Sequence, residues 1–78
     1  MALSGHQRMV IARANEEGYF PTNAQAKRIA RLSCDLYLAA KNQPNPVDHT
    51  LMAECDAAAV EQVMEGDADR NPRHVKLV

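Results

Sequence analysis

The hydrophobic residues of this chain recur at helical spacing in three segments, at about residues 4–17, 22–42 and 46–65. Each segment is bounded by residues that favour a helix end. Ser4 can cap the first helix, and Gly18 suits the left-handed position that follows it. The sequence therefore predicts an all-α fold, a small bundle of three helices.

The second predicted helix has a specific start signal, because Thr22 and Gln25 match the Thr-x-x-Gln pattern of a capping box. Its main apolar stripe consists of Ala26, Ile29, Ala30, Ser33, Leu36, Tyr37 and Ala40. Its second half carries further apolar residues, namely Leu32, Cys34, Leu38 and Ala39. Because that half is apolar nearly all round, we expect it to be the most buried part of the protein.

The third predicted helix has two apolar stripes, and its charges are all acidic. One stripe is formed by Leu51, Met52, Cys55, Ala59 and Val63. The other is formed by Ala53, Ala57, Val60 and Met64. A helix with a single neighbour needs only one apolar stripe. The second stripe is therefore covered either by the first helix or by another subunit.

A short break with two prolines, residues 42–46, separates the second helix from the third. Asn45 can cap the third helix, and Gly66 is expected to end it. Because the connection is short, these two helices should form an antiparallel hairpin, with the N-terminal helix packed across it.

The hairpin also predicts a register, in which residues at the same height have numbers that sum to about 89. This register pairs Cys34 with Cys55 and Arg28 with Glu61. Helix axes are about 8–10 Å apart, which is too far for an unstrained disulfide without unusually close approach. We therefore expect two buried thiols that act as small hydrophobic side chains.

The chain has 78 residues, enough for one domain, which we expect to span residues 1–66 and to be followed by an irregular tail, residues 67–78. The net charge of −1 conceals an asymmetry, because residues 1–41 carry +3 and residues 42–78 carry −4. The favoured interpretation is attraction between basic and acidic helices within one fold. The alternative is a charged docking surface.

No segment is long and apolar enough to cross a membrane, and the N-terminus lacks the apolar core of a signal peptide. Two cysteines do not form a disulfide framework. These observations place the protein in the cytoplasm by default.

Motifs for catalysis or for cofactor binding are absent from the sequence. There is no glycine-rich phosphate loop and no nucleophile motif. The histidines and cysteines lack the spacing of zinc ligands, and we expect the histidines to be exposed to solvent. We therefore predict no enzyme activity, no cofactor and no metal.

Tyr19 and Phe20 are adjacent aromatic residues in the predicted turn between the first two helices. In one interpretation, one of them closes the end of the core and the other is half exposed. In the other, they anchor a protein partner, because aromatic residues dominate interface energies. The sequence leaves both interpretations open.

Three basic residues, Lys27, Arg28 and Arg31, lie opposite the apolar stripe of the second helix. Two helices joined by a short turn resemble a helix-turn-helix in outline, in which these side chains would contact DNA. The chain is not basic overall, which disfavours nucleic acid as a partner.

These considerations favour a small non-enzymatic protein-binding module, such as an accessory, adaptor, inhibitor or other regulatory protein. Its predicted partner-binding residues are Tyr19, Phe20, Lys27, Arg28 and Arg31. Homodimer formation is a further expectation, because a lone copy leaves apolar surface uncovered. The alternative function is a helix-turn-helix-like DNA-binding regulator.

Overall fold

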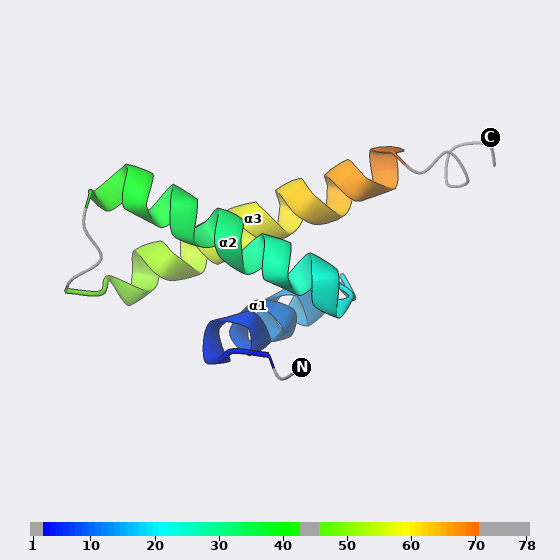
Figure 1. Cartoon of the computed structure of the whole chain (residues 1–78), viewed down its shortest axis with the longest axis horizontal. Helices are drawn as coiled ribbons and strands as arrows, with labels where there is room; N and C mark the ends of the chain where they lie inside the picture. The colour runs from blue at the N-terminus through cyan, green and yellow to red at the C-terminus, as the bar shows by residue number, and fades with distance from the viewer. Residues whose placement is uncertain (1–2, 43–45, 71–78) are drawn as a thin grey trace.

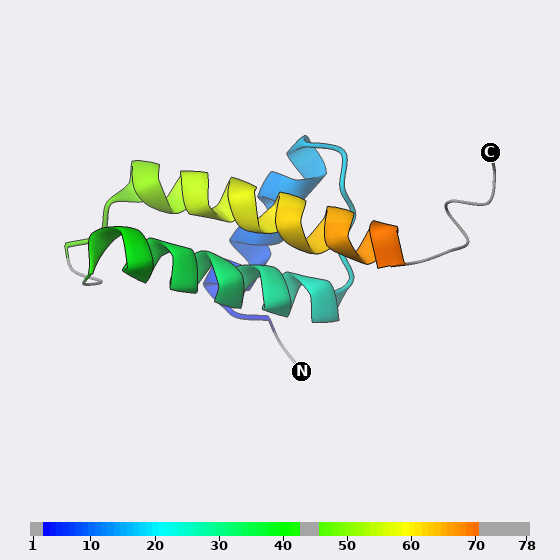
Figure 2. The same ribbon diagram turned by 90° about the horizontal axis from the view of Figure 1, so that it is seen from above.

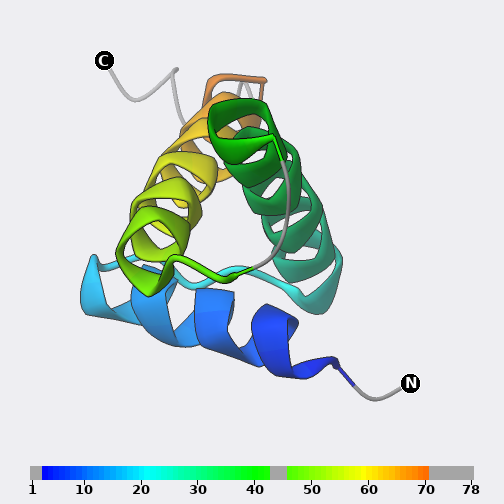
Figure 3. The same ribbon diagram turned by 90° about the vertical axis from the view of Figure 1, so that its left-hand side faces the viewer.

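The computed structural model describes residues 3–42 and 46–70, and its secondary structure consists of three α-helices. They are α1 (Gly5–Glu16), α2 (Asn23–Lys41) and α3 (His49–Arg70). Helices α2 and α3 run antiparallel side by side and form a hairpin (Figure 2). Helix α1 crosses one face of this hairpin and contacts both of its helices (Figures 1 and 3). The predicted all-α three-helix bundle is confirmed.

The first two helices begin with the same local device. The Ser4 side chain accepts a hydrogen bond from the backbone N–H of Gln7, and the Gln7 side chain accepts one from the backbone of Ser4. Thr22 and Gln25 form the same reciprocal pair at the start of α2, as predicted. Both helix starts are thus stabilised by pairs of residues three positions apart.

The predicted bounds of the third helix are wrong at both ends. The helix begins at His49, where the Asp48 carboxylate accepts a hydrogen bond from the Leu51 N–H at 3.0 Å. Asn45, the predicted cap, lies outside the described residues. At the other end, the helix continues through Gly66 to Arg70, so residues 67–70 are helical rather than part of an irregular tail.

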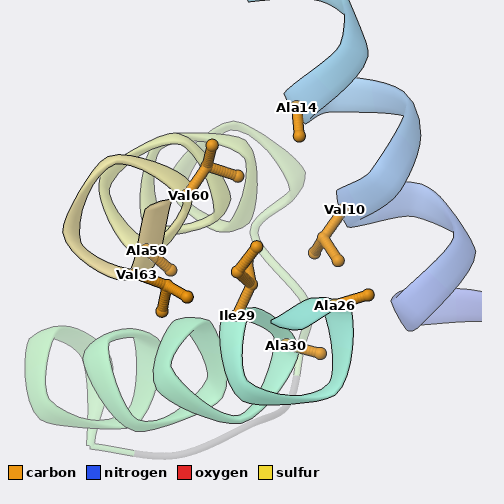
Figure 4. Close-up of a cluster of buried hydrophobic side chains, with 8 residues drawn as sticks. All are labelled: Val10, Ala14, Ala26, Ile29, Ala30, Ala59, Val60 and Val63. Carbon is orange, nitrogen blue, oxygen red and sulfur yellow. The ribbon is translucent and has the colours of Figure 1, made fainter. Parts of the chain in front are cut away.

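The core lies where α1 crosses the hairpin. Its buried residues are Val10, Ala14, Ala26, Ile29, Ala30, Ala59, Val60 and Val63 (Figure 4). Val60 belongs to the second stripe of α3 and lies in the same buried cluster as Val10 and Ala14, so α1 covers this part of the stripe. Most side chains in the cluster are small, so the three helices approach each other closely.

The second half of α2 is not the most buried part of the molecule, contrary to the prediction. Cys34, Leu38 and Ala39 are exposed, because α1 covers the first half of α2 instead. Ser33 is a buried exception in this half, and the larger one is Tyr37. Its hydroxyl accepts hydrogen bonds from the Asp48 N–H at 2.8 Å and from Lys41 Nζ at 3.2 Å, which closes this end of the hairpin.

The predicted register is correct at the centre of the hairpin, where Ser33 Oγ bonds to Asp56 Oδ1 at 2.5 Å. The predicted pair of Arg28 with Glu61 is wrong. Arg28 instead makes a bidentate contact with Asp67, with N–O distances of 2.9 and 3.0 Å. The extension of α3 beyond Gly66 places Asp67 within reach of this side chain.

Candidate functional site

The turn between α1 and α2 separates the two neighbouring aromatic residues. Gly18 has a φ of 91°, and the Tyr19 N–H donates to the Ala14 carbonyl at 2.9 Å, as in a left-handed helix end. The Tyr19 ring packs against the core, and its hydroxyl donates to Glu65 Oε2 at 2.6 Å. Tyr19 therefore closes the core, as one of the two interpretations held.

The Tyr19 hydroxyl lies in an acidic environment. Its hydrogen bond to Glu65, its desolvation and the nearby carboxylates of Glu65, Glu61 and Glu17 raise the pKa of Tyr19 to about 12. The proton on this hydroxyl is therefore held more tightly in the folded chain than in the unfolded chain. This contact ties the α1–α2 turn to α3.

Phe20, the next residue, is 76% exposed. The residues on both sides of it are fixed, by the Tyr19 contacts on one side and by the Thr22 capping box on the other. An exposed aromatic ring on a fixed backbone loses little conformational entropy when it binds a partner. Phe20 is thus suited to act as an anchor.

The three predicted basic contacts have different environments. Lys27 and Arg31 are exposed, and they form no ion pair within the described residues. Arg28 is bound to Asp67, and this hydrogen bond together with the charge of Asp67 raises the pKa of Arg28. The structure therefore leaves two of the three basic side chains available to a partner on the outer surface of α2.

A buried carboxylate lies at the point where the three helices meet. Asp56 is fully buried, and its two oxygens are bound by residues of the other two helices. Arg13 Nε lies 3.0 Å from Oδ2, His6 Nε2 lies 2.9 Å from Oδ1, and the Ser33 hydroxyl donates to Oδ1. Hydrogen bonds and an opposite charge compensate the burial of this group.

The two cysteines have different environments, which corrects the prediction of two buried thiols. Cys55 is buried, and this burial, together with the charges of Asp56 and Glu54, raises the pKa of its thiol. Cys34 is exposed, and its Sγ is 3.7 Å from His6 Nδ1. Both thiols are free.

The histidines also differ from the prediction. His6 is partly buried by its contacts with Asp56 and Cys34, whereas His49 is exposed as expected. His74 lies outside the described residues.

Sequence reasoning missed the network around Asp56. One signal was present, because Ser33 is a polar residue within an apolar stripe. His6 and Arg13 are seven residues apart and therefore lie on the same side of α1. No local pattern, however, indicates that Asp56 faces them.

Within residues 3–42 and 46–70, no group of three or more His, Cys, Asp or Glu side chains has the arrangement of a metal site. The described helices also include none that is long and apolar enough to span a membrane. Comparison of the chain with protein-family models, curated proteins and solved structures finds no match. The function must therefore be inferred from the residues themselves.

Proposed function

We propose that this chain is a non-enzymatic protein-binding module whose contact surface contains Phe20 and the exposed basic residues Lys27 and Arg31. The observation that carries this proposal is the 76% exposure of Phe20 on a turn whose backbone is fixed on both sides. Aromatic and arginine side chains are enriched among the residues that contribute most to binding energy. Tyr19 and Arg28 support this surface through Glu65 and Asp67.

The charges on this surface suggest the chemistry of the partner. Phe20 lies in the connection that leads into α2, and the first half of α2 carries Lys27 and Arg31, both exposed. A matching partner would offer an apolar pocket for the ring and acidic residues beside it. The aromatic anchor would supply affinity, and the two cations would speed association and fix the orientation. An accessory, adaptor or inhibitor role would follow from such a contact.

Affinity capture from a native extract tests this proposal. The immobilised wild-type chain should retain a protein partner, and Phe20→Ala should lose it. Val47→Ala is a matched control, because Val47 is also an exposed apolar residue but lies beyond the other end of α2. Equal retention of the partner by the wild-type and Phe20→Ala chains would contradict the proposal.

The charge contribution has its own test. Reversal of both cations, Lys27→Glu with Arg31→Glu, should weaken capture, and wild-type binding should fall as salt is raised. Arg8→Glu is the matched control on α1, where this residue is also exposed. If the Arg8 variant binds as weakly as the double variant, net charge rather than this surface governs binding.

Two further experiments test the alternative function, DNA binding, and the expected homodimer. A gel shift with mixed duplex DNA at low salt, weakened by Lys27→Ala and Arg31→Ala, would favour the helix-turn-helix-like regulator instead. Light scattering would reveal a homodimer, and loss of that dimer in Phe20→Ala would identify a second copy of the chain as the partner.

A further inference from the structure

Cys34 lies at one end of a chain of contacts that involves all three helices. Its Sγ is 3.7 Å from Nδ1 of His6 on α1, and Nε2 of the same ring is 2.9 Å from Oδ1 of Asp56 on α3. The thiol is exposed to solvent, whereas the carboxylate is fully buried. A nucleophile, a base and a carboxylate that orients the base thus lie in sequence from the surface inward.

The buried contacts determine which ring nitrogen of His6 faces the sulfur as an acceptor. Asp56 forms an ion pair with Arg13, and Oδ1 also accepts the Ser33 hydroxyl proton. A carboxylate in this state can only accept hydrogen bonds, so the His6 nitrogen beside it must be the protonated one. In the neutral ring, Nδ1 then carries the lone pair and can accept the thiol proton of Cys34.

We propose that Cys34 is a reactive thiol that exchanges with low-molecular-weight disulfides, with His6 as its base and Asp56 as the residue that positions the base. The thiol proton passes to Nδ1, and the sulfur attacks one sulfur of the disulfide. The S–S bond of the disulfide breaks as the new bond to Cys34 forms, and the departing thiolate takes up the proton. The small disulfide is the oxidant, and each exchange reaction yields one mixed disulfide at Cys34 and one free small thiol.

The other cysteine provides an internal contrast. Cys55 is buried, and its raised pKa keeps it in the unreactive thiol form. In the folded chain, the modification should therefore be confined to Cys34. Mass spectrometry after treatment with oxidised glutathione should locate a single glutathione adduct at this residue.

The rate of exchange tests the role of His6. The probe is dipyridyl disulfide, which is uncharged and releases an absorbing product, and the chain carries Cys55→Ser so that one thiol remains. At neutral pH, the folded chain should react about tenfold faster than the same chain in urea, because the imidazole is placed to accept the thiol proton as the sulfur attacks. A folded chain that reacts no faster than the unfolded chain would overturn the proposal, and this comparison needs no further substitution.

His6→Gln then shows whether the fast exchange of Cys34 depends on a base or only on the exposure of the thiol. Glutamine retains a hydrogen-bond donor for Asp56 but lacks a basic nitrogen, so the folded rate should fall about tenfold. His49→Gln removes an exposed histidine at the start of α3 and should leave the rate unchanged. An unchanged rate in a folded His6→Gln chain would contradict the role of His6.

The positioning role of Asp56 has a spectroscopic readout. The nitrogen chemical shifts of His6 should report a proton on Nε2 in the wild-type chain. Asp56→Asn should weaken this preference and lower the exchange rate, because an amide can also donate a hydrogen bond to the ring. If Nδ1 carries the proton in the neutral wild-type ring, the proposed direction of proton transfer is wrong.

Discussion

Helix α1 contacts the α2–α3 hairpin through two regions that differ in chemistry. In one, Val10 and Ala14 pack against apolar residues of both helices, including Ile29 and Val60. In the other, His6 and Arg13 bind a single buried carboxylate, Asp56. Both regions lie along one side of a helix of only 12 residues.

The two regions contribute differently to the fold: one mainly adds stability, and the other mainly fixes the position of α1. In the apolar region, stability falls in proportion to the number of methylene groups removed, and neighbouring side chains partly fill the space that is left. The contacts of Asp56 depend on one another, because removal of one partner leaves a buried charge undercompensated. The polar region therefore requires a particular placement of α1, whereas the apolar region mainly stabilises it.

The largest expected effect tests the apolar region. Ile29→Ala removes a fully buried side chain from the centre of the cluster and should lower the free energy of unfolding by about 3 kcal/mol. Urea denaturation followed by circular dichroism measures this change. Leu38→Ala on the same helix is the control, and its effect should stay within about 0.5 kcal/mol because this residue is 44% exposed and lies outside the core cluster. Similar losses in both variants would contradict the difference in burial between Ile29 and Leu38.

The second test concerns the polar region. Arg13→Met should lower the free energy of unfolding by about 2 kcal/mol, because the buried carboxylate of Asp56 then lacks its cation. This value allows for the solvent that reaches Arg13, whose side chain is 34% exposed. Adding Asp56→Asn to Arg13→Met removes the buried charge. The loss of unfolding free energy in the double variant should therefore be clearly smaller than the sum of the losses in the two single variants. Arg8→Met, at an exposed position on α1, is the control with little effect. Strictly additive losses would show that Arg13 and Asp56 are not coupled.

A smaller effect concerns the link between the α1–α2 turn and α3. The folded pKa of Tyr19 is raised to about 12, so the folded chain keeps a proton that the unfolded chain releases above about pH 10. Its stabilising contribution is complete below pH 10 and is lost as pH rises toward 12. Tyr19→Phe should therefore melt at a lower temperature than the wild type at pH 7, and this difference should shrink through that alkaline range. A difference that is constant with pH would contradict the contact with Glu65.

The smallest effect is expected at Phe20. Because 76% of this residue is exposed, Phe20→Ala should change the free energy of unfolding by no more than about 0.5 kcal/mol. Thermal or urea denaturation checks this value. A large loss of stability would indicate that the ring belongs to the core and would remove the main support for a role in partner binding.

Helix ends were predicted correctly where they depend on residues only a few positions apart. The capping box at Thr22 and the left-handed turn at Gly18 are both present in the structure. The prediction failed at Gly66, because a glycine within a helix costs only about 1 kcal/mol, which tertiary contacts can offset. Here Asp67 bonds to Arg28 and Gln25 of α2, so the last turns of α3 remain packed beside that helix.

The charge asymmetry was also informative, but its partners were not all predictable. Basic residues of the first two helices pair with acidic residues of the third, as the favoured interpretation held. Arg28 was assigned to the wrong carboxylate, because a long side chain can reach several positions and the end of α3 was placed too early. The partner surface proposed from residue types stays a prediction, and the sequence did not decide which of the two aromatic residues is exposed, Phe20, and which is partly buried, Tyr19.

By itself, the sequence determined the number of helices, the capped starts of the first two and the antiparallel pairing of the second and third, because these features depend on local periodicity and short connections. Only the tertiary structure decided that His6, Arg13 and Ser33 surround Asp56 and that Cys34 remains at the surface. These residues are up to 50 positions apart, and the angle at which α1 crosses the hairpin brings them together. That angle depends on the packing of all three helices at once, which no single segment of the chain encodes.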